Sequence, residues 1–121
     1  MFYIEDDKVY LTKGDSAALT MTVYSGDTAY TLQSGDLLTM SVRKQPTDQS
    51  PLLLSVTSTS GRLVISHEDS KSIPAGKYSA DVQLTTSGGE RYTIWPELPV
   101  GKRHKAKNYG NFIIMPEVTT T

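Results

Sequence analysis

The densest group of chemically active side chains in this sequence is a basic stretch near its C-terminal end. The stretch GKRHKAK holds four of the chain's twelve Lys and Arg residues and one of its two His residues: Lys102, Arg103, His104, Lys105 and Lys107. Clustered cations bind a polyanion by releasing its counterions, and the nearby Tyr109 could stack on a base, so the stretch could bind phosphate or nucleic acid. The alternative is a solvated loop or hairpin tip, or a patch that meets an acidic protein surface. The formal net charge of −1 favours this alternative and argues against nucleic acid as a partner.

Two acidic stretches are candidate metal sites. The stretch EDD at 5–7 could hold calcium together with other carboxylates, but it lacks the ligand spacing of a calcium loop. A turn between two short strands explains it better. His67 precedes Glu68 and Asp69, and a two-His site would require His67 and His104 to converge. The exposed surface of a helical turn explains these residues better, so we expect no metal site.

The motifs of common enzymes are missing from the sequence. The chain has no Cys, which excludes thiolate nucleophiles, disulfides and Cys-based zinc sites. No Gly-x-Ser-x-Gly elbow occurs, and the glycines of TSGGERY lie between two predicted strands rather than before a helix. We therefore expect a protein that is not an enzyme and that takes no cofactor.

Length and composition indicate one domain, spanning 1–121. A chain of 121 residues can bury one core, and its Thr, Val and Ile residues favour strands. No apolar run approaches the roughly twenty residues that span a bilayer. The N-terminal segment MFYIEDD is acidic and does not read as a signal peptide. We expect a soluble protein made in the cytoplasm, without membrane contact.

Strict alternation of apolar and polar residues is the main structural signal. In DLLTMSVRK, Leu38, Met40 and Val42 share one parity. The same alternation holds in KYSADVQL, whose apolar residues are Tyr78, Ala80, Val82 and Leu84. Successive side chains of a strand point to opposite faces, so such runs have one face on a core and one in water. Gly-Asp and Gly-Gly pairs separate the runs, and SGGE predicts a hairpin. The pattern predicts an all-β, immunoglobulin-like antiparallel sandwich of about seven to nine strands.

The stretch SHEDSKSIPAGKY interrupts the alternation. Ser66 followed by Asp69 is typical of the start of a helical turn, here near 67–72, which Pro74 must end. Pro74 and Gly76 then reverse the chain into a central strand. Tyr78 stands where immunoglobulin-like sandwiches carry a Tyr whose hydroxyl closes this corner on the backbone.

The C-terminal segment indicates an assembly surface. We expect a core at 8–100, the basic loop at 101–110 and an apolar strand at 111–118. Pro96 and Pro99 should force the strand that contains Trp95 to an edge or out of the sheet. The last strand is apolar on both faces and would be an aggregation hazard at an exposed edge, so we expect another chain to cover it. The candidate interface residues are Trp95, Phe112, Ile113, Ile114 and Met115.

Several segments resemble the N-terminal domain of phage baseplate upper proteins and related small tail proteins from phages of Gram-positive hosts. VYLTKGDSAALTMTV resembles the opening strand, Gly-Asp turn and second strand, and YTLQSGDLLTMSVRK the next turn and strand. GRLVISHEDSKSIPAGKYSADVQLTTSGGERYTI resembles the most recognisable part of that domain. The resemblance covers about 8–95, whereas PELPVGKRHKAKNYG departs from the family pattern by intervening before the last strand.

The resemblance implies a phage or prophage virion structural or assembly protein, in the tail or baseplate, that acts through protein–protein contacts. We expect a homo-oligomer, for which a trimer is one candidate, with other virion proteins as further partners. Its location would be the bacterial host cytoplasm during synthesis and the virion afterwards. The alternative is a carbohydrate- or ligand-binding β-sandwich module, with Trp95, Tyr24, Tyr30 or Tyr109 as stacking platforms.

Overall fold

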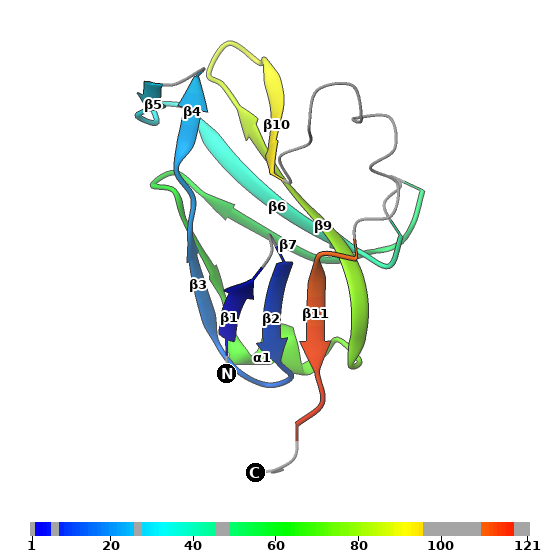
Figure 1. Cartoon of the computed structure of the whole chain (residues 1–121). Coiled ribbons are helices and arrows are strands. Elements are labelled where there is room, and N and C mark those ends of the chain that lie inside the picture. The colour runs from blue at the N-terminus through cyan, green and yellow to red at the C-terminus, as the bar shows by residue number, and fades with distance from the viewer. Residues whose placement is uncertain (1, 6–7, 26–27, 46–48, 96–109, 118–121) are drawn as a thin grey trace.

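A computed structural model describes residues 2–5, 8–25, 28–45, 49–95 and 110–117 (Figure 1). These residues form eleven strands and one short helix. The strands are β1 (Phe2–Glu5), β2 (Lys8–Thr12), β3 (Ala17–Thr20), β4 (Val23–Ser25), β5 (Thr28–Tyr30), β6 (Leu37–Arg43), β7 (Leu52–Ser58), β8 (Arg62–Ile65), β9 (Gly76–Thr85), β10 (Arg91–Trp95) and β11 (Phe112–Met115). The helix, α1 (His67–Lys71), lies between β8 and β9.

The strands form the predicted all-β sandwich. The large sheet has the order β1-β2-β11-β9-β6-β7, and β10 pairs with β9 as well. All its neighbouring pairs are antiparallel except β2 and β11, which run parallel. β3 pairs with β8, and β4 with β5, in two small antiparallel sheets. More strands are present than the seven to nine expected, because the run SAALTMTVY divides into β3 and β4 and the short strands β1 and β5 add to the count.

The alternation read from the sequence follows the core. In β6, every second residue is buried (Leu38, Met40 and Val42), and the residues between them are half-buried. In β9, the four predicted residues at 78, 80, 82 and 84 are all buried. Each strand of this kind presents one face to the interior and the other outward, as a half-buried strand should. The core also contains Phe112 and Ile114, beyond the predicted limit of residue 100.

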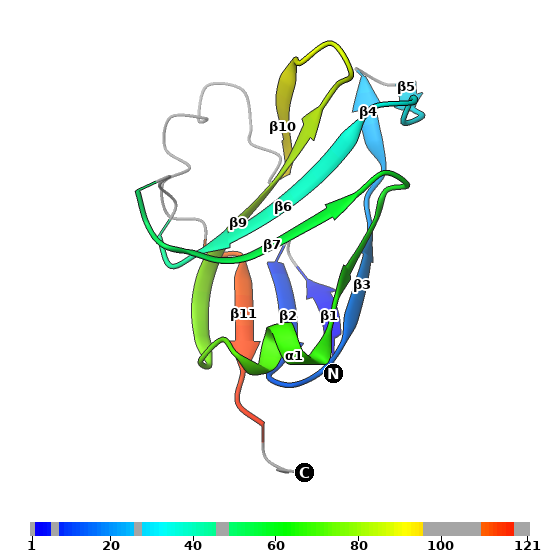
Figure 2. The same cartoon turned by 180° about the vertical axis from the view of Figure 1, so that it is seen from behind.

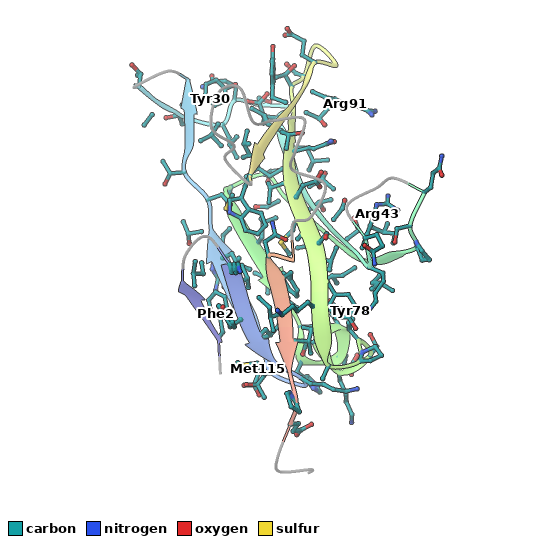
Figure 3. All side chains as sticks on the ribbon, turned by 45° about the vertical axis from the view of Figure 1, so that its right-hand side comes forward. Phe2, Tyr30, Arg43, Tyr78, Arg91 and Met115 are labelled. Atoms are coloured by element: carbon teal, nitrogen blue, oxygen red, sulfur yellow. The ribbon has the colours of Figure 1, made fainter. Side chains whose placement is uncertain are left out.

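The helical turn and the corner after it form as predicted. The Ser66 hydroxyl caps α1 by accepting a hydrogen bond from the Asp69 N–H at 3.1 Å. The chain then turns at Pro74, and the Tyr78 hydroxyl donates to the Pro74 carbonyl. Figure 3 shows Tyr78 on the lower part of β9, far from Tyr30 at the upper end of the molecule. Tyr78 therefore closes the lower corner, and its ring also lies 5.1 Å from the Lys44 ammonium.

A buried hydroxyl holds α1 against the sheet. Ser70 is fully buried, and its hydroxyl donates to the Asp15 carbonyl at 2.7 Å. The same oxygen accepts a hydrogen bond from the Gly14 N–H at 3.0 Å. Gly14 and Asp15 form the turn between β2 and β3, so one side chain joins segments that lie far apart in sequence. The helix closes the lower end of the sandwich through this contact (Figure 2).

The last strand does not lie at an edge, so that expectation was wrong. β11 lies between β2 and β9, with Phe112 in register with Val9 on one side and with Tyr78 on the other. Phe112 and Ile114 are buried in the core, whereas Ile113 and Met115 on the other face are half-buried. An internal position explains the two-sided apolar character, because both faces of a central strand can be covered from within the chain.

Asn111 fixes β11 in this position. Its side-chain Oδ1 accepts a hydrogen bond from the Ala80 N–H at 2.8 Å, and its Nδ2 donates to the Ala80 carbonyl at 2.9 Å. Its backbone carbonyl accepts from the Val9 N–H at 2.8 Å. The side-chain amide thus replaces a backbone peptide on the edge of β9, between the segment paired with β11 and the segment paired with β10. Asn111 is 4% exposed, so these bonds form away from water.

Removing the corner hydroxyl tests the role of Tyr78. We expect Tyr78→Phe to lower the free energy of unfolding by about 1 kcal/mol, because a part-buried hydrogen bond is lost while the ring stays in place. Urea unfolding followed by circular dichroism measures the change. Tyr92→Phe is the matched control, since Tyr92 is 52% exposed and its hydroxyl bonds only to Glu90 among the described residues. Equal midpoints for the two variants would contradict the corner's role.

Asn111 should be more sensitive than Tyr78. We expect Asn111→Ala to cost about 2 to 4 kcal/mol, because both polar groups of the buried Ala80 peptide lose their partner. Asn111→Asp keeps the shape but places a negative charge beside the Ala80 carbonyl, and should cost at least as much at pH 7. Lowering the pH should restore part of this loss, since a protonated carboxyl can again donate. Urea midpoints of both variants at pH 7 and pH 5, compared with wild type at each pH, test this expectation.

Candidate functional site

The structure brings together none of the metal candidates that it describes. Among the described residues, no group of three His, Asp or Glu side chains could hold a metal ion. His67, Glu68 and Asp69 lie in α1 and are exposed, as expected for the surface of a helical turn. Glu5 ends β1 and is in register with Lys8 of β2, which agrees with a turn between two short strands. Asp6 and Asp7 lie outside the described residues.

The basic patch also lies outside the described residues. Lys102, Arg103, Lys105 and Lys107 belong to 96–109, together with His104 and Tyr109. The structure does describe the residues on either side of this segment and their contacts with the large sheet. Trp95 is in register with Val82, and Asn111 binds Ala80, so both ends of this segment stand on one edge of β9.

Trp95 is not presented to solvent as an isolated aromatic platform. It is half-buried and packs against the core, as does Ile94 before it. The pairing of β10 with β9 is irregular between Thr93 and Trp95, which breaks the predicted alternation. Tyr92 lies before this irregularity, in register with the buried Leu84, and is nevertheless 52% exposed; its strand pairs only with β9 among the described strands. Only the exposed part of the half-buried Trp95 side chain is therefore accessible to a partner.

A buried carboxylate organises the turn before β6. Asp36 is 3% exposed and accepts hydrogen bonds from the Tyr30 hydroxyl at 2.5 Å and from the Gln33 N–H at 2.8 Å. These bonds lower the pKa of Asp36, with the Tyr30 hydroxyl the largest cause. The same contact raises the pKa of Tyr30. Tyr30 is thus engaged in the fold and is a poor stacking platform; the side chain of Tyr24 and all of Tyr109 lie outside what the structure describes.

The outer face of β6 and β9 is polar. Asp81 pairs across the strands with Ser41, and Arg43 with Ser79. Burial raises the pKa of Asp81, and the positive charge of Arg43 partly opposes that rise. The Arg43 guanidinium also donates to the Ser50 carbonyl at 2.6 Å, and this bond fixes the segment that leads into β7. The arrangement is one of structural support, in which Arg43 positions the start of the next strand.

The feature best suited to binding another protein is the outer side of β7, which we call the β7 edge and define as Leu52–Ser58. β6 pairs with the inner side of β7 from Leu38↔Ser58 to Arg43↔Leu52, and no described strand pairs with the outer side. Figure 2 shows β7 at the front as the last strand of its sheet. Leu52 and Leu53 are 49% and 38% exposed, and they are two of the few large aliphatic side chains exposed in the described structure.

A bulge divides this edge into two parts. Val42 is in register with Leu54 and Arg43 with Leu52, so Leu53 is the extra residue on β7. From Leu54 to Ser58 the pairing is regular, with Leu54 buried, Val56 half-buried and Ser55 and Thr57 facing outward. The sequence run LLLSV predicts a strand, but nothing in the run shows that the strand ends a sheet.

Comparisons of the chain with protein-family models, with curated proteins and with solved structures found no match. Within the described ranges, no helix is long and apolar enough to cross a membrane.

The Asp36 carboxylate should make stability depend on pH. Because its folded-state pKa lies below the ordinary value of 3.8, its stabilising contribution is complete above that value and is lost as the pH falls through the folded-state pKa. We expect the difference in urea midpoint between wild type and Asp36→Asn to shrink between about pH 5 and about pH 2. Tyr30→Phe should weaken this pH dependence, since it removes the main cause of the lowered pKa. A difference in urea midpoint between wild type and Asp36→Asn that stays constant from about pH 5 to about pH 2 would contradict the lowered pKa of Asp36.

Proposed function

We propose that this chain is a non-enzymatic structural or assembly protein of a phage or prophage virion, a component of the tail or baseplate. The observation that carries the proposal is the β7 edge, which no described strand pairs with on its outer side and which includes the exposed Leu52 and Leu53. Unpaired strand edges bind other chains through main-chain hydrogen bonds, and they are a hazard when left open. A protein built to assemble has a use for such an edge.

The resemblance to the baseplate domain supports the same proposal. The segments that carry it correspond to β2 through β10, and the most recognisable one includes α1, the Tyr78 corner and β9. The departure at PELPVGKRHKAKNYG falls between β10 and β11. The basic residues of that segment suit a partner with an acidic surface, and the proposed partners are other virion proteins and further copies of the chain.

The carbohydrate-binding alternative has less support. Such a module needs aromatic rings that face solvent, and Trp95 and Tyr30 both pack against the core. Of the aromatic side chains that the structure describes, Tyr92 is the exposed one. A single exposed Tyr at a strand edge is weak grounds for a sugar platform.

The mass of the protein in solution tests the proposal. We expect size-exclusion chromatography with light scattering to show a closed oligomer whose population grows over a series from about 1 μM to about 1 mM. Closed symmetry is expected because it satisfies every exposed edge with a finite number of copies. A monomer at all concentrations would contradict self-assembly. Saturable binding in a glycan screen by that monomer would then favour the carbohydrate-binding alternative.

A further inference from the structure

The charge of the β7 edge differs from that of the other strands that border the large sheet. β1 ends at Glu5, next to Lys8 of β2, and β10 begins at Arg91. Charged side chains on a border strand discourage pairing with another strand. β7 has the sequence LLLSVTS, with no charged residue and no Pro. Its regular part, Leu54–Ser58, therefore lacks the features that keep a strand edge from pairing.

From this we infer that the β7 edge pairs with the β7 edge of a second copy of the chain, antiparallel and about a two-fold axis at Val56. The inference deepens the proposed function and rests on it, because it names the surface and the partner through which assembly begins. The two-fold axis places Val56 opposite Val56 of the second copy and Ser55 opposite its Thr57. The regular segment 54–58 is centred on Val56, so all five residues take part in the pairing.

The side chains of the segment are self-complementary in this register. On the outer face, each Ser55 hydroxyl meets the Thr57 hydroxyl of the second copy, and Ser–Thr pairs across strands are favourable. On the inner face, half-buried Val56 gains a β-branched partner. When two identical strands pair, each charged side chain lies close to the same charged side chain of the second copy, and the two repel. β7 has no charged residue, so its pairing with a second β7 meets no such repulsion. Leu52 and Leu53 then fall beside the turn that follows Ser58 in the second copy.

A charge placed on the edge tests the inference. Thr57 is exposed and points outward, so Thr57→Lys should fold normally and yet bring two new positive charges together across the axis. We expect its mass by light scattering to fall to half that of the wild type, or to a smaller oligomer without the two-fold contact. Thr93→Lys on β10 is the matched control, since Thr93 is also exposed on a border strand. Circular dichroism and thermal unfolding establish that both variants are folded.

Cysteine cross-linking tests the register independently. The chain has no Cys, so a single introduced thiol can form a protein–protein disulfide only with another copy. Directly opposed residues of antiparallel strands have Cα atoms about 4.5 to 5.5 Å apart, which a disulfide can bridge. We expect a mixture of Ser55→Cys and Thr57→Cys proteins, incubated with oxidised glutathione, to form a cross-linked dimer much faster than either variant alone. A mixture of Ser55→Cys with Thr93→Cys is the control.

The outcomes separate this inference from the proposed function. A wild-type oligomer whose mass is unchanged by Thr57→Lys would overturn the β7 pairing and leave an assembly protein that uses another surface. A wild-type trimer with no even-numbered species would also overturn it, because two-fold pairs alone cannot build an odd ring. A wild-type monomer throughout the concentration series would overturn both the pairing and self-assembly. Loss of half the mass in Thr57→Lys alone, with cross-linking of the mixed cysteine variants, supports the inference.

Discussion

Two hydrogen bonds between the Asn111 amide and the Ala80 peptide determine how the large sheet is joined. Ala80 is 1% exposed, so its N–H and carbonyl need partners within the protein. Asn111 supplies both and aligns the chain so that Phe112 begins β11 beside Tyr78. β11 is the strand between the β1–β2 hairpin and the strands that begin with β9. The hairpin therefore joins the rest of the sheet through a strand that one polar side chain aligns.

Small buried polar groups perform the same task at both ends of the sandwich. Ser70 joins α1 to the turn after β2, and Tyr78 joins β9 to the turn after α1. At the other end, the Asp36 carboxylate accepts hydrogen bonds from the Tyr30 hydroxyl and the Gln33 N–H. No buried side-chain polar atom among the described residues lacks a hydrogen-bond partner. Apolar burial drives the strands together without direction, and these bonds select one arrangement from the several that the alternation would allow.

The sequence was informative where structure is decided locally. β6 and β9 alternate because each has one covered face, and the corner at Tyr78 follows from a helix stop, a turn and a Tyr at the right spacing. The position of β11 could not be predicted in this way. A run that is apolar on both faces fits a covered edge and a central strand equally well, and only its neighbours decide between them. Asn111 gave no signal either, because nothing in the segment NFIIM shows that an amide will bind a peptide 31 residues away.

The candidate site illustrates the same limit. The basic stretch and Trp95 were candidate binding residues because of their side-chain chemistry. The basic stretch lies outside the described residues, and Trp95 packs against the core. The β7 edge carries no reactive group, and its interest comes from the absence of a neighbouring described strand, which is a property of the topology. Local sequence predicts that a strand exists more readily than it predicts which strands lie beside it.

The placement of β10 and β11 on one edge of β9 has a consequence for how this protein can be altered. Trp95 and Asn111 meet β9 at Val82 and Ala80, so the two points where the intervening chain joins the sheet are about 7 Å apart along the strand. The sheet sets this span whatever sequence connects the two points. Doubling the length of a flexible connection costs only about 0.6 kcal/mol in closure entropy. The described sandwich therefore constrains the chain between Trp95 and Asn111 through this span, and a foreign peptide inserted between them would have to close the same distance.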